Sequence, residues 1–464
     1  MNIQDLYSLY QSCDCSVCTD SRRVKSGDMF FALKGENFNG NDYALSALEK
    51  GAAAAVVDDP ALAGHSGVVL VEDSFAALQS LAVYHRTHVA DGQLKVIGLT
   101  GTNGKTTTKN LISLVLSKKY RVVATEGNLN NDIGVPLSLL KVRPDTQIAV
   151  IEMGANHPDD ITRLVQVCTP DYGLITNIGV AHIQGFGSFE GVVKAKNELY
   201  RYLGSKPGSL IFVNEDDELL RSLSSKQSCH CFGYGLKYQD QGAEILKGDA
   251  QNPNLRLKLK GRVISTQLFG EYNAANVLAA LCVGEYFGVD FEVACEAVEE
   301  FCPNNKRSQM LRTERNTLIV DAYNANPSSM AAALQSFSNM SPQASAGESA
   351  EENAGNGAGA GERKLALLGQ MRELGSCSLQ EHERVLCTLR SIGIDAWLVG
   401  EEFRNALAAL ESGGMASGGK DVTFRCFDSS ADLASYLHSN PLVGYTILIK
   451  GSRSVEMEKV LGEL

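Results

Sequence analysis

The chain has 464 residues, of which 44% are hydrophobic and 21% charged, and a formal net charge of -12. Its length predicts about three domains, and its negative charge argues against a nucleic-acid partner, whose phosphates it would repel. Because no apolar run approaches the ~20 residues of a membrane-spanning helix and the first residues lack a signal-peptide pattern, we expect a cytoplasmic enzyme without a membrane span.

Residues 1–90 alternate short apolar runs with helical patterns, which predicts a small α/β domain. Strands are expected at 29–33, 54–57 and 68–71, and helices at 44–48 and 76–82. The polar segment 91–93 contains a glycine and is expected to act as a hinge.

Residues 96–107 are the most informative segment of the chain. They predict a buried strand, a loop with two glycines, and a helix that begins at Lys105. Such a loop turns backbone N–H groups toward a phosphate and places a helix N-terminus behind it. Although Leu99 stands where G-x-x-x-x-G-K-[ST] has its first glycine, Gly-Lys-Thr in this context predicts a nucleoside triphosphate site. The predicted cradle comprises Gly101, Thr102, Asn103, Gly104, Lys105, Thr106 and Thr107.

Within this cradle, Lys105 is expected to reach the terminal phosphates of the nucleotide. The hydroxyl of Thr106 or Thr107 is expected to bind Mg²⁺. The alternative is a tight strand–helix turn that binds no ligand.

Three further apolar runs, at 148–153, 172–177 and 209–214, predict more strands of a mostly parallel sheet in a central domain at 91–308. Ligands of such sheets lie at the carboxyl ends of the strands. We therefore expect site residues at the polar positions that end these runs, which are Glu152, Asn177 and Asn214.

A third α/β domain is expected at 309–464, with strands near 318–321, 365–369, 396–400 and 445–450. The segment 341–361 is rich in Ala, Gly, Ser, Glu and Asn and has no apolar period. This composition predicts a disordered surface insertion within the domain, because it cannot bury enough apolar surface to fold.

Several single residues allow two interpretations. Glu152 would be a buried anion and needs an arginine or a metal ion as partner. His182 is either a core histidine or a site residue, and Lys196 is either part of a solvated helix face or part of the site. Asn273 and Asn276 either cap a helix or offer their amides to a purine edge.

The motifs at 100–107, 152–157, 176–178, 181–182, 195–196, 273–276 and 321–327 together resemble the Mur ligases of peptidoglycan synthesis. Motifs 152–157 and 323–327 are most similar to the member that adds D-alanyl-D-alanine to UDP-N-acetylmuramoyl-tripeptide. The same holds for 20–22, 27–33, 368–375 and 450–453, so the resemblance covers nearly the whole chain. Residues that depart from the usual family pattern are Asn39, Asn41, Val320 and Gln370.

The resemblance implies three α/β domains: a UDP-substrate domain at 1–90, a central ATP-binding domain at 91–308 and a Rossmann-like domain at 309–464. It also implies a two-step reaction with ATP and Mg²⁺. ATP phosphorylates the terminal carboxylate of UDP-N-acetylmuramoyl-tripeptide, and the amine of D-alanyl-D-alanine attacks the resulting acyl phosphate. A monomer is expected.

The resemblance further implies a role for each matching residue. Lys105, Glu152, His182 and Lys196 match catalytic positions. Of these, Glu152 and His182 match ligands of a second Mg²⁺, and Lys196 matches a carbamoylated lysine that assists the metal. The nucleotide-binding positions outside the cradle are Asn273, Asn276, Arg307 and Asp321. The substrate-binding positions are Ser21 and Arg22, beside the uridine nucleotide, and Asn324 and Asn326.

Three other functions fit part of the sequence. The first is another ligase of the same superfamily, such as a different Mur ligase or a folylpolyglutamate synthase. The second is a P-loop switch or motor ATPase, which would need only a nucleotide and a protein partner. The third is an inactive nucleotide-binding protein, which the joint presence of Lys105, Glu152, His182 and Lys196 disfavours.

Overall fold

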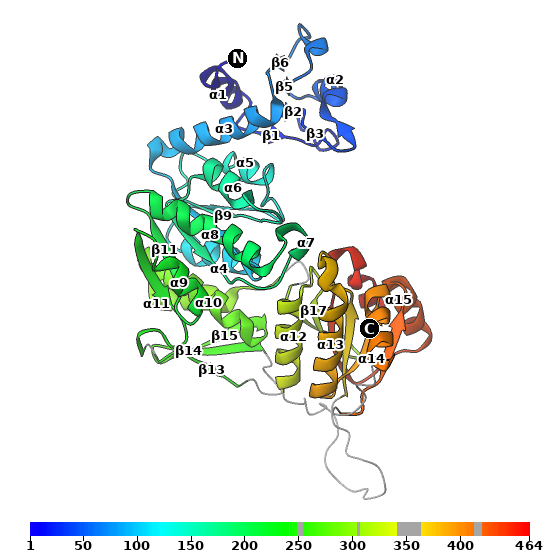
Figure 1. Cartoon of the computed structure of the whole chain (residues 1–464). Coiled ribbons are helices and arrows are strands. Elements are labelled where there is room, and N and C mark those ends of the chain that lie inside the picture. Colours follow the sequence, from blue (N-terminus) through cyan, green and yellow to red (C-terminus); the bar gives the residue numbers. More distant parts are fainter. Residues whose placement is uncertain (241, 248–253, 304–306, 341–362, 413–419) are drawn as a thin grey trace, which may run out of the picture.

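The computed structural model describes residues 1–240, 242–247, 254–303, 307–340, 363–412 and 420–464. Its sheets follow one another along the chain, and helices cover their faces (Figure 1). The predicted α/β class, with a mostly parallel central sheet and a Rossmann-like C-terminal sheet, is confirmed. None of the helices in the described ranges combines the length and apolar composition that a membrane span requires.

The N-terminal region contains a four-stranded parallel sheet in the order β1-β2-β5-β6. The predicted strands and helices are present, but α1 was not predicted, although Asn2 caps it and Leu6 and Tyr10 bury one face. The strands are β1 Val17–Cys18, β2 Met29–Phe31, β3 Lys34–Gly35, β4 Phe38–Asn39, β5 Ala54–Val57 and β6 Val68–Leu70, and the helices are α1 Ile3–Ser12, α2 Ala44–Glu49 and α3 Ser74–His88.

Helix α3 connects this region to the next, because its apolar side shares a core with the central sheet. Polar contacts reinforce the junction: the ring Nε2 of His85 lies 3.0 Å from the Val142 carbonyl, and Arg86 forms an ion pair of 2.8 Å with Asp171. The chain then turns through left-handed backbone at Ala90 and at Asp91, the first residue of the predicted hinge.

The central sheet has six parallel strands in the order β12-β11-β10-β7-β9-β8. Side chains alternate between two cores, so α4, α10 and α11 cover one face and α5, α6 and α8 the other. The strands are β7 Lys95–Thr100, β8 Val122–Ala124, β9 Ile148–Glu152, β10 Tyr172–Ile175, β11 Leu210–Asn214 and β12 His230–Tyr234. The helices are α4 Lys105–Ser117, α5 Gly134–Leu139, α6 Asp160–Cys168, α7 Ile183–Phe186, α8 Phe189–Ser205, α9 Glu218–Ser224, α10 Ala274–Tyr286 and α11 Phe291–Glu300.

A small antiparallel sheet, β13 Glu244–Leu246, β14 Asn254–Leu259 and β15 Arg262–Phe269, extends the central region toward the C-terminal sheet. The C-terminal sheet has the order β16-β17-β21-β18-β19-β20, in which only β16 is antiparallel to its neighbour. Its strands are β16 Gln309–Arg312, β17 Thr317–Asp321, β18 Arg363–Gly369, β19 Asp395–Val399, β20 Phe424–Phe427 and β21 Tyr445–Lys450.

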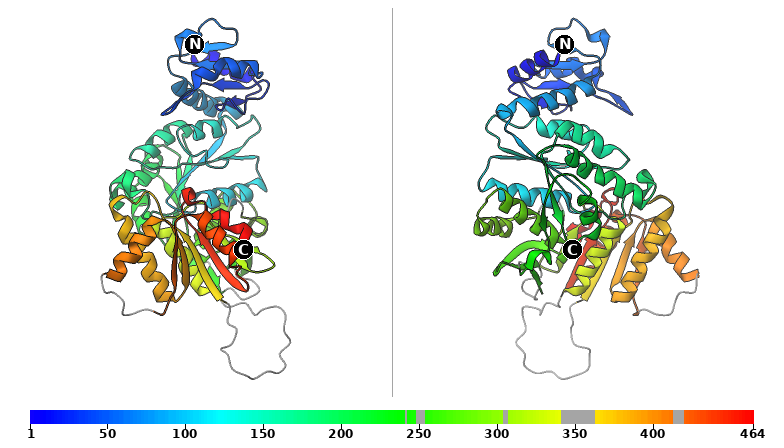
Figure 2. Two further views of the ribbon diagram at one scale, coloured as in Figure 1. Left: turned by 90° about the vertical axis from the view of Figure 1, so that its right-hand side faces the viewer. Right: turned by 60° about the vertical axis from the view of Figure 1, so that its left-hand side comes forward.

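In the described part of this region, four α-helices pack on the C-terminal sheet: α12 Pro327–Asn339, α13 Ser378–Ile392, α14 Glu401–Ser412 and α15 Ser430–Ser439. Helices α12, α13 and α14 share one core and α15 another, which places them on opposite faces (Figure 2). The predicted insertion at 341–361 lies outside the described residues. The domain limits at 90 and 308 stay predictions.

Candidate active site

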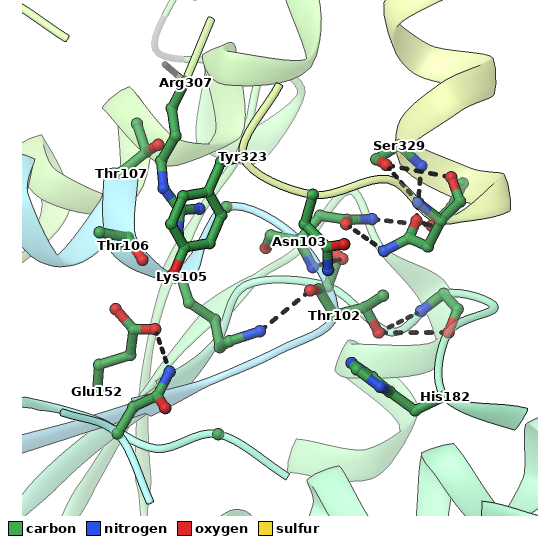
Figure 3. Close-up of a pocket in the computed structure, with 18 of the residues that line it drawn as sticks. Thr102, Asn103, Lys105, Thr106, Thr107, Glu152, His182, Arg307, Tyr323 and Ser329 are labelled. Carbon is green, nitrogen blue, oxygen red and sulfur yellow. Dashed lines mark hydrogen bonds between the residues drawn. The ribbon is translucent and has the colours of Figure 1, made fainter. Parts of the chain in front are cut away.

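A cavity of about 540 Å³ lies between the carboxyl ends of the central strands and the C-terminal sheet. Figure 3 shows side chains from both sides of this cavity turned toward one another. The predicted residues that line it are Thr102, Asn103, Gly104, Lys105, Thr106, Thr107, Glu152, Asn177, His182, Asn273, Asn276, Arg307, Asp321, Asn324 and Asn326.

The two loop glycines are required by backbone shape and by space. Gly101 and Gly104 have φ of 149° and 77°. A Cβ at Gly101 would lie 2.0 Å from Thr176 Oγ1, and a Cβ at Gly104 would lie 2.6 Å from Asn276 Oδ1. A side chain at either position would therefore collide with the wall of the site as well as strain the backbone.

The two residues that follow β10, Thr176 and Asn177, hold the phosphate loop in place through hydrogen bonds. Thr102 N donates to Asn177 O at 2.9 Å, and Asn103 N donates to Asn177 Oδ1 at 3.0 Å. Asn177 Nδ2 and Thr176 Oγ1 both donate to Asn103 O, at 3.0 and 2.6 Å. These bonds occupy the loop's early amides, so the first-turn N–H groups of α4, which have no partner within a helix, are the ones left to face a phosphate.

Lys105 bends back over the loop (Figure 3), where its Nζ donates to Gly101 O at 2.8 Å and to Thr102 O at 3.1 Å. Burial lowers the pKa of Lys105, and the nearby carboxylate of Glu152 opposes that shift. A phosphate in the cavity would offer this ammonium a stronger, charged partner than the two carbonyls.

Glu152 ends β9 and is 2% exposed. Its Oε1 accepts a bond of 2.9 Å from Asn130 Nδ2, whereas its buried Oε2 has no hydrogen-bond partner within the described structure. Lys109 donates to the Thr125 carbonyl close by, and burial lowers the pKa of Lys109 while Glu152 opposes the shift. An unpaired buried carboxylate oxygen is costly without a cation, so it marks a place where a metal fits.

Asn130 and Lys109 were not predicted from the sequence. The signals for them are weak: Asn130 belongs to an asparagine-rich segment after β8, and Lys109 follows Lys105 by one turn of α4. An asparagine in a loop and a lysine in a helix are both common, so the residue type at these positions does not indicate a site.

His182 lies at the start of α7 in left-handed backbone with φ of 51°. Its Nδ1 contacts the carboxylate of Glu373 from the C-terminal region, and Gln184 N donates to Glu373 O at 3.4 Å. Burial lowers the pKa of His182, and Glu373 opposes that shift. Because the imidazole lines the cavity and meets a carboxylate across it, the interpretation as a core histidine is wrong.

Lys196 lies within α8 and is 2% exposed, so the interpretation as a solvated helix face is wrong. Its Nζ donates to Ala155 O at 3.4 Å and lies 5.6 Å from the centre of the Phe186 ring. Burial lowers the pKa of Lys196 to about 7. Burial therefore favours the uncharged, nucleophilic form of this amine. Lys196 is not among the described residues that line the cavity.

Asn273 and Asn276 lie on the α10 side of the cavity. Asn273 Nδ2 donates to Phe269 O at 2.7 Å, and Asn276 Nδ2 donates to Asn273 Oδ1 at 2.8 Å. Asn276 Oδ1 accepts a bond of 2.9 Å from Thr108 Oγ1 of α4. Asn273 makes no side-chain cap bond to α10, which rules out the simple capping interpretation at that position.

The C-terminal wall is built on the ends of two neighbouring strands, β17 and β21. Asp321 and Lys450 are paired in register there, and Lys450 Nζ lies 2.5 Å from Asp321 Oδ2. Ser308 N donates to Asp321 Oδ1 at 3.2 Å. Beside them, the Arg307 guanidinium lies 3.5 Å from the centre of the Tyr323 ring. Lys450 was not predicted as a site residue, because it reaches Asp321 only through the pairing of two strands that are distant in the sequence.

Asn326 caps α12, because its Oδ1 accepts a bond of 2.9 Å from Ser329 N. Its Nδ2 donates to Asn103 Oδ1 at 2.8 Å, across the cavity. Asn324 O accepts a bond of 3.4 Å from Lys450 Nζ.

A second cavity of about 390 Å³ adjoins the first and shares His182, Asn324 and Asn326 with it. Ala181 and Ala325 also line it, and the rest of the wall comes from two loops of the C-terminal sheet. Those loops contribute Arg372, Glu373, Ser452, Arg453 and Ser454.

Three predicted residues lie elsewhere. Ser21 and Arg22 are in the N-terminal region, where Arg22 pairs with Asp20 at 2.8 Å and its side chain is 86% exposed. The prediction that Asn214 belongs to the site is wrong: it ends β11, which β10 separates from β7, and its Oδ1 accepts a bond of 3.1 Å from Asp216 N.

Comparison with known proteins gives matches along almost the entire chain. The Mur ligase middle domain matches residues 99–284, and the Mur ligase family catalytic domain matches residues 16–88. The UDP-N-acetylmuramoyl-tripeptide--D-alanyl-D-alanine ligase of Bacillus subtilis is 33% identical over 97% of this chain and 92% of its own length. The Escherichia coli ligase of the same name is 31% identical over 97% of this chain and 93% of its own length.

A solved structure agrees with these matches. MurF from Acinetobacter baumannii superposes with a TM-score of 0.79 at 29% identity, covering 98% of this chain and 97% of that one. The resemblance predicted from the motifs is thus confirmed by relatives of similar length and by a similar fold. The chain belongs to the Mur ligase family.

Proposed function

We propose that this protein is an ATP-dependent ligase that adds D-alanyl-D-alanine to UDP-N-acetylmuramoyl-tripeptide, through an acyl phosphate, in the synthesis of peptidoglycan precursors. The observation that carries the proposal is the phosphate loop set against Glu152 and His182 in one cavity, in a chain with full-length relatives named for this reaction. A different Mur ligase or a folylpolyglutamate synthase would share the loop but not that set of relatives.

ATP fits the larger cavity. Lys105 and the first-turn amides of α4 would neutralise charge on the terminal phosphates as the phosphoryl group moves. Asn273 and Asn276, two buried amides on the wall, would face the adenine side. Asp321 would face the ribose, with Arg307 beside it.

The residues present also fit Mg²⁺. The unpartnered Oε2 of Glu152 and the hydroxyl of Thr106 are hard oxygen donors, and His182 faces the same cavity. Bound Mg²⁺ would screen the charges of the phosphate oxygens and the carboxylate that they approach. No group of three or more His, Cys, Asp or Glu side chains in the described ranges is arranged for a metal, so the remaining ligands would be substrate oxygens and a modified Lys196.

Lys196 would act as a carbamate. Its lowered pKa, about 7, leaves an uncharged amine that can react with CO₂. The amine nitrogen forms a bond to the carbon of CO₂ and loses one proton to solvent, and the resulting carbamate anion suits a site beside a metal ion better than an ammonium does.

The incoming dipeptide fits the second cavity. Arg372 and Arg453 bring two positive charges to a chain of net charge -12, and a guanidinium pairs well with a terminal carboxylate. His182 belongs to both cavities, so an amine in the second would lie next to the acyl phosphate formed in the first.

Several finer points belong to the same proposal. Ser21 and Arg22 would contact the uridine nucleotide, and residues 1–90, 91–308 and 309–464 would act as the substrate, ATP and C-terminal domains. We propose that the enzyme works as a monomer in the cytoplasm, where its nucleotide substrates are made.

The experiment is a phosphate-release assay in which each substrate is omitted in turn. Release should require ATP, Mg²⁺, a UDP-N-acetylmuramoyl-tripeptide and D-alanyl-D-alanine together, and lysine- and diaminopimelate-containing tripeptides should be compared. Equal release without acceptor and amine would indicate a switch or motor ATPase instead. Preference for a shorter UDP-linked acceptor or for a folate would indicate another ligase of the superfamily.

A further inference from the structure

Three side chains connect the phosphate loop to the start of α12. Asn326 Nδ2 donates to Asn103 Oδ1 at 2.8 Å, and Asn103 Nδ2 donates to Ser328 Oγ at 2.8 Å. Ser328 Oγ donates in turn to Asn326 Oδ1 at 2.9 Å. The three bonds close on themselves, and Figure 3 shows them among the dashed lines beside Asn103. We call Asn103, Asn326 and Ser328 the polar ring.

Both ends of the ring are held rigidly. On the loop side, the backbone N–H and carbonyl of Asn103 are bound by Asn177, so its side chain projects from a fixed point. On the α12 side, Asn326 and Ser329 bond each other's backbone reciprocally in a capping box. The ring is therefore a connection between two ordered elements.

Ser328 also packs tightly against Gly179, which follows β10 and is bonded to the phosphate loop. Gly179 N donates to Thr102 Oγ1 at 2.9 Å, and a Cβ at Gly179 would lie 2.7 Å from Ser328 Oγ. Only glycine lets Ser328 approach this closely. Neither loop geometry nor helix capping requires that approach, because Asn326 and Ser329 alone cap the helix.

We propose that the polar ring positions the C-terminal wall of the nucleotide site against the phosphate loop, with Ser328 as a positioning residue that contributes to nucleotide affinity. The segment from Asp321 to Asn326 begins with the residue assigned to the ribose, and the ring fixes the end of that segment to the loop that takes the phosphates. The inference rests on the proposed use of ATP, but not on the identity of the amine or the acceptor.

Ser328→Ala is the sharpest test, because it removes two ring bonds and leaves the capping box intact. ADP binding, measured by calorimetry without other substrates, should weaken by about 2- to 10-fold, the factor of a net hydrogen bond. Turnover at saturating ATP should change less than the KM for ATP, and the melting temperature should stay near that of the parent. Ser328→Thr, which keeps the hydroxyl, should restore affinity.

Ser338→Ala is the matched control, since its hydroxyl donates to Gln335 O on the exposed side of the same helix. It should bind ADP as the parent does. Hydrogen exchange gives a second readout: ADP should slow exchange of the backbone amides of Asn326 and of residues 328–330 in the parent and not in Ser328→Ala. Unchanged ADP affinity and unchanged protection in Ser328→Ala would overturn the proposal. Parent protein that binds ADP but forms no ligation product would contradict the proposed function and leave this test valid.

Discussion

The active-site cavity has a central wall, formed by the phosphate loop and the ends of the central strands, opposite the C-terminal wall. The two walls hold their charged groups in different ways. On the central wall, Lys105 contacts only loop carbonyls, and one oxygen of Glu152 has no partner in the described structure. On the C-terminal wall, both oxygens of Asp321 are occupied, by Lys450 and by Ser308 N. The central wall therefore has charge available for a phosphate or a metal ion, whereas the carboxylate of Asp321 on the C-terminal wall is already paired.

The difference indicates that the two walls have different functions within one site. Available charge in a low-dielectric pocket stabilises developing charge best, which suits the wall where a phosphoryl group would be transferred. Charge that is already paired gives a fixed shape, which suits a wall that positions the nucleoside. The comparison predicts that substitutions on the central wall lower turnover, whereas substitutions on the C-terminal wall lower stability and affinity.

Lys105→Ala should have the largest effect. It removes a cation placed against the transferring phosphoryl group, and loss of such a group typically costs ~10²-fold or more in rate. The ligation rate and the thermal melting curve should be measured together, with Lys118→Ala at the other end of α4 as control. A rate within a few-fold of the parent, with an unchanged melting curve, would contradict the phosphate-loop assignment.

Lys196→Ala should be nearly inactive, because it removes the amine that we expect to carry the carbamate. Added short carboxylic acids should restore part of the ligation rate by filling the vacated anionic position. Lys194→Ala, two residues earlier on the exposed side of α8, should behave like the parent. Near-normal activity of Lys196→Ala in CO₂-depleted buffer would rule out the carbamate.

Lys450→Met should affect stability more than turnover. It leaves the Asp321 carboxylate without its cation, and hydrogen bonds to charged groups contribute about 1.5–3 kcal/mol. Denaturant unfolding and the KM for ATP are the measurements, and Lys459→Met, an exposed lysine, is the control. A large loss of turnover without loss of stability would contradict the contrast between the two walls.

The lowered pKa of Lys196 also predicts a pH dependence of stability. Between the folded pKa of about 7 and the usual value of 10.5, the unfolded chain binds a proton that the folded chain does not. The free energy of unfolding should therefore rise with pH in this window, by at most about 1.4 kcal/mol per unit, relative to Lys196→Met. The comparison needs CO₂-free buffer. Parallel curves for the two proteins would show that Lys196 is charged when folded.

The smallest effect is expected from replacing 341–361 with a short Gly-Ser linker. The composition of this segment cannot bury enough apolar area to offset the cost of ordering it. Ligation rate and melting temperature should both stay nearly unchanged. A clear loss of either would show that the segment packs or binds.

Local sequence predicted the central wall well, because strand, loop and helix are contiguous there and Lys105 follows its glycines directly. The buried strands could also be predicted, because each of them is a contiguous apolar run. Local sequence could not pair Asp321 with Lys450, since that contact depends on β17 lying beside β21 in a sheet assembled from distant segments. The error at Asn214 has a related cause: strand ends mark a site only near the middle of the sheet, and strand order is not local information.

The same limit applies to contacts between the walls. Nothing in the pattern around Asn103 or Glu373 indicates that they meet Asn326 and His182, because each pair joins elements on different sheets. The motifs at these positions were recognisable as a family pattern. Their physical partners became visible only with the fold.

The most direct test of the central claim is transfer of oxygen from acceptor to phosphate. The tripeptide acceptor is labelled with ¹⁸O in its terminal carboxylate and ligated to D-alanyl-D-alanine with unlabelled ATP. Formation and aminolysis of an acyl phosphate would deliver one carboxylate oxygen to the released phosphate, so mass spectrometry should find ¹⁸O-labelled phosphate in step with product. Product formed with unlabelled phosphate would contradict the account.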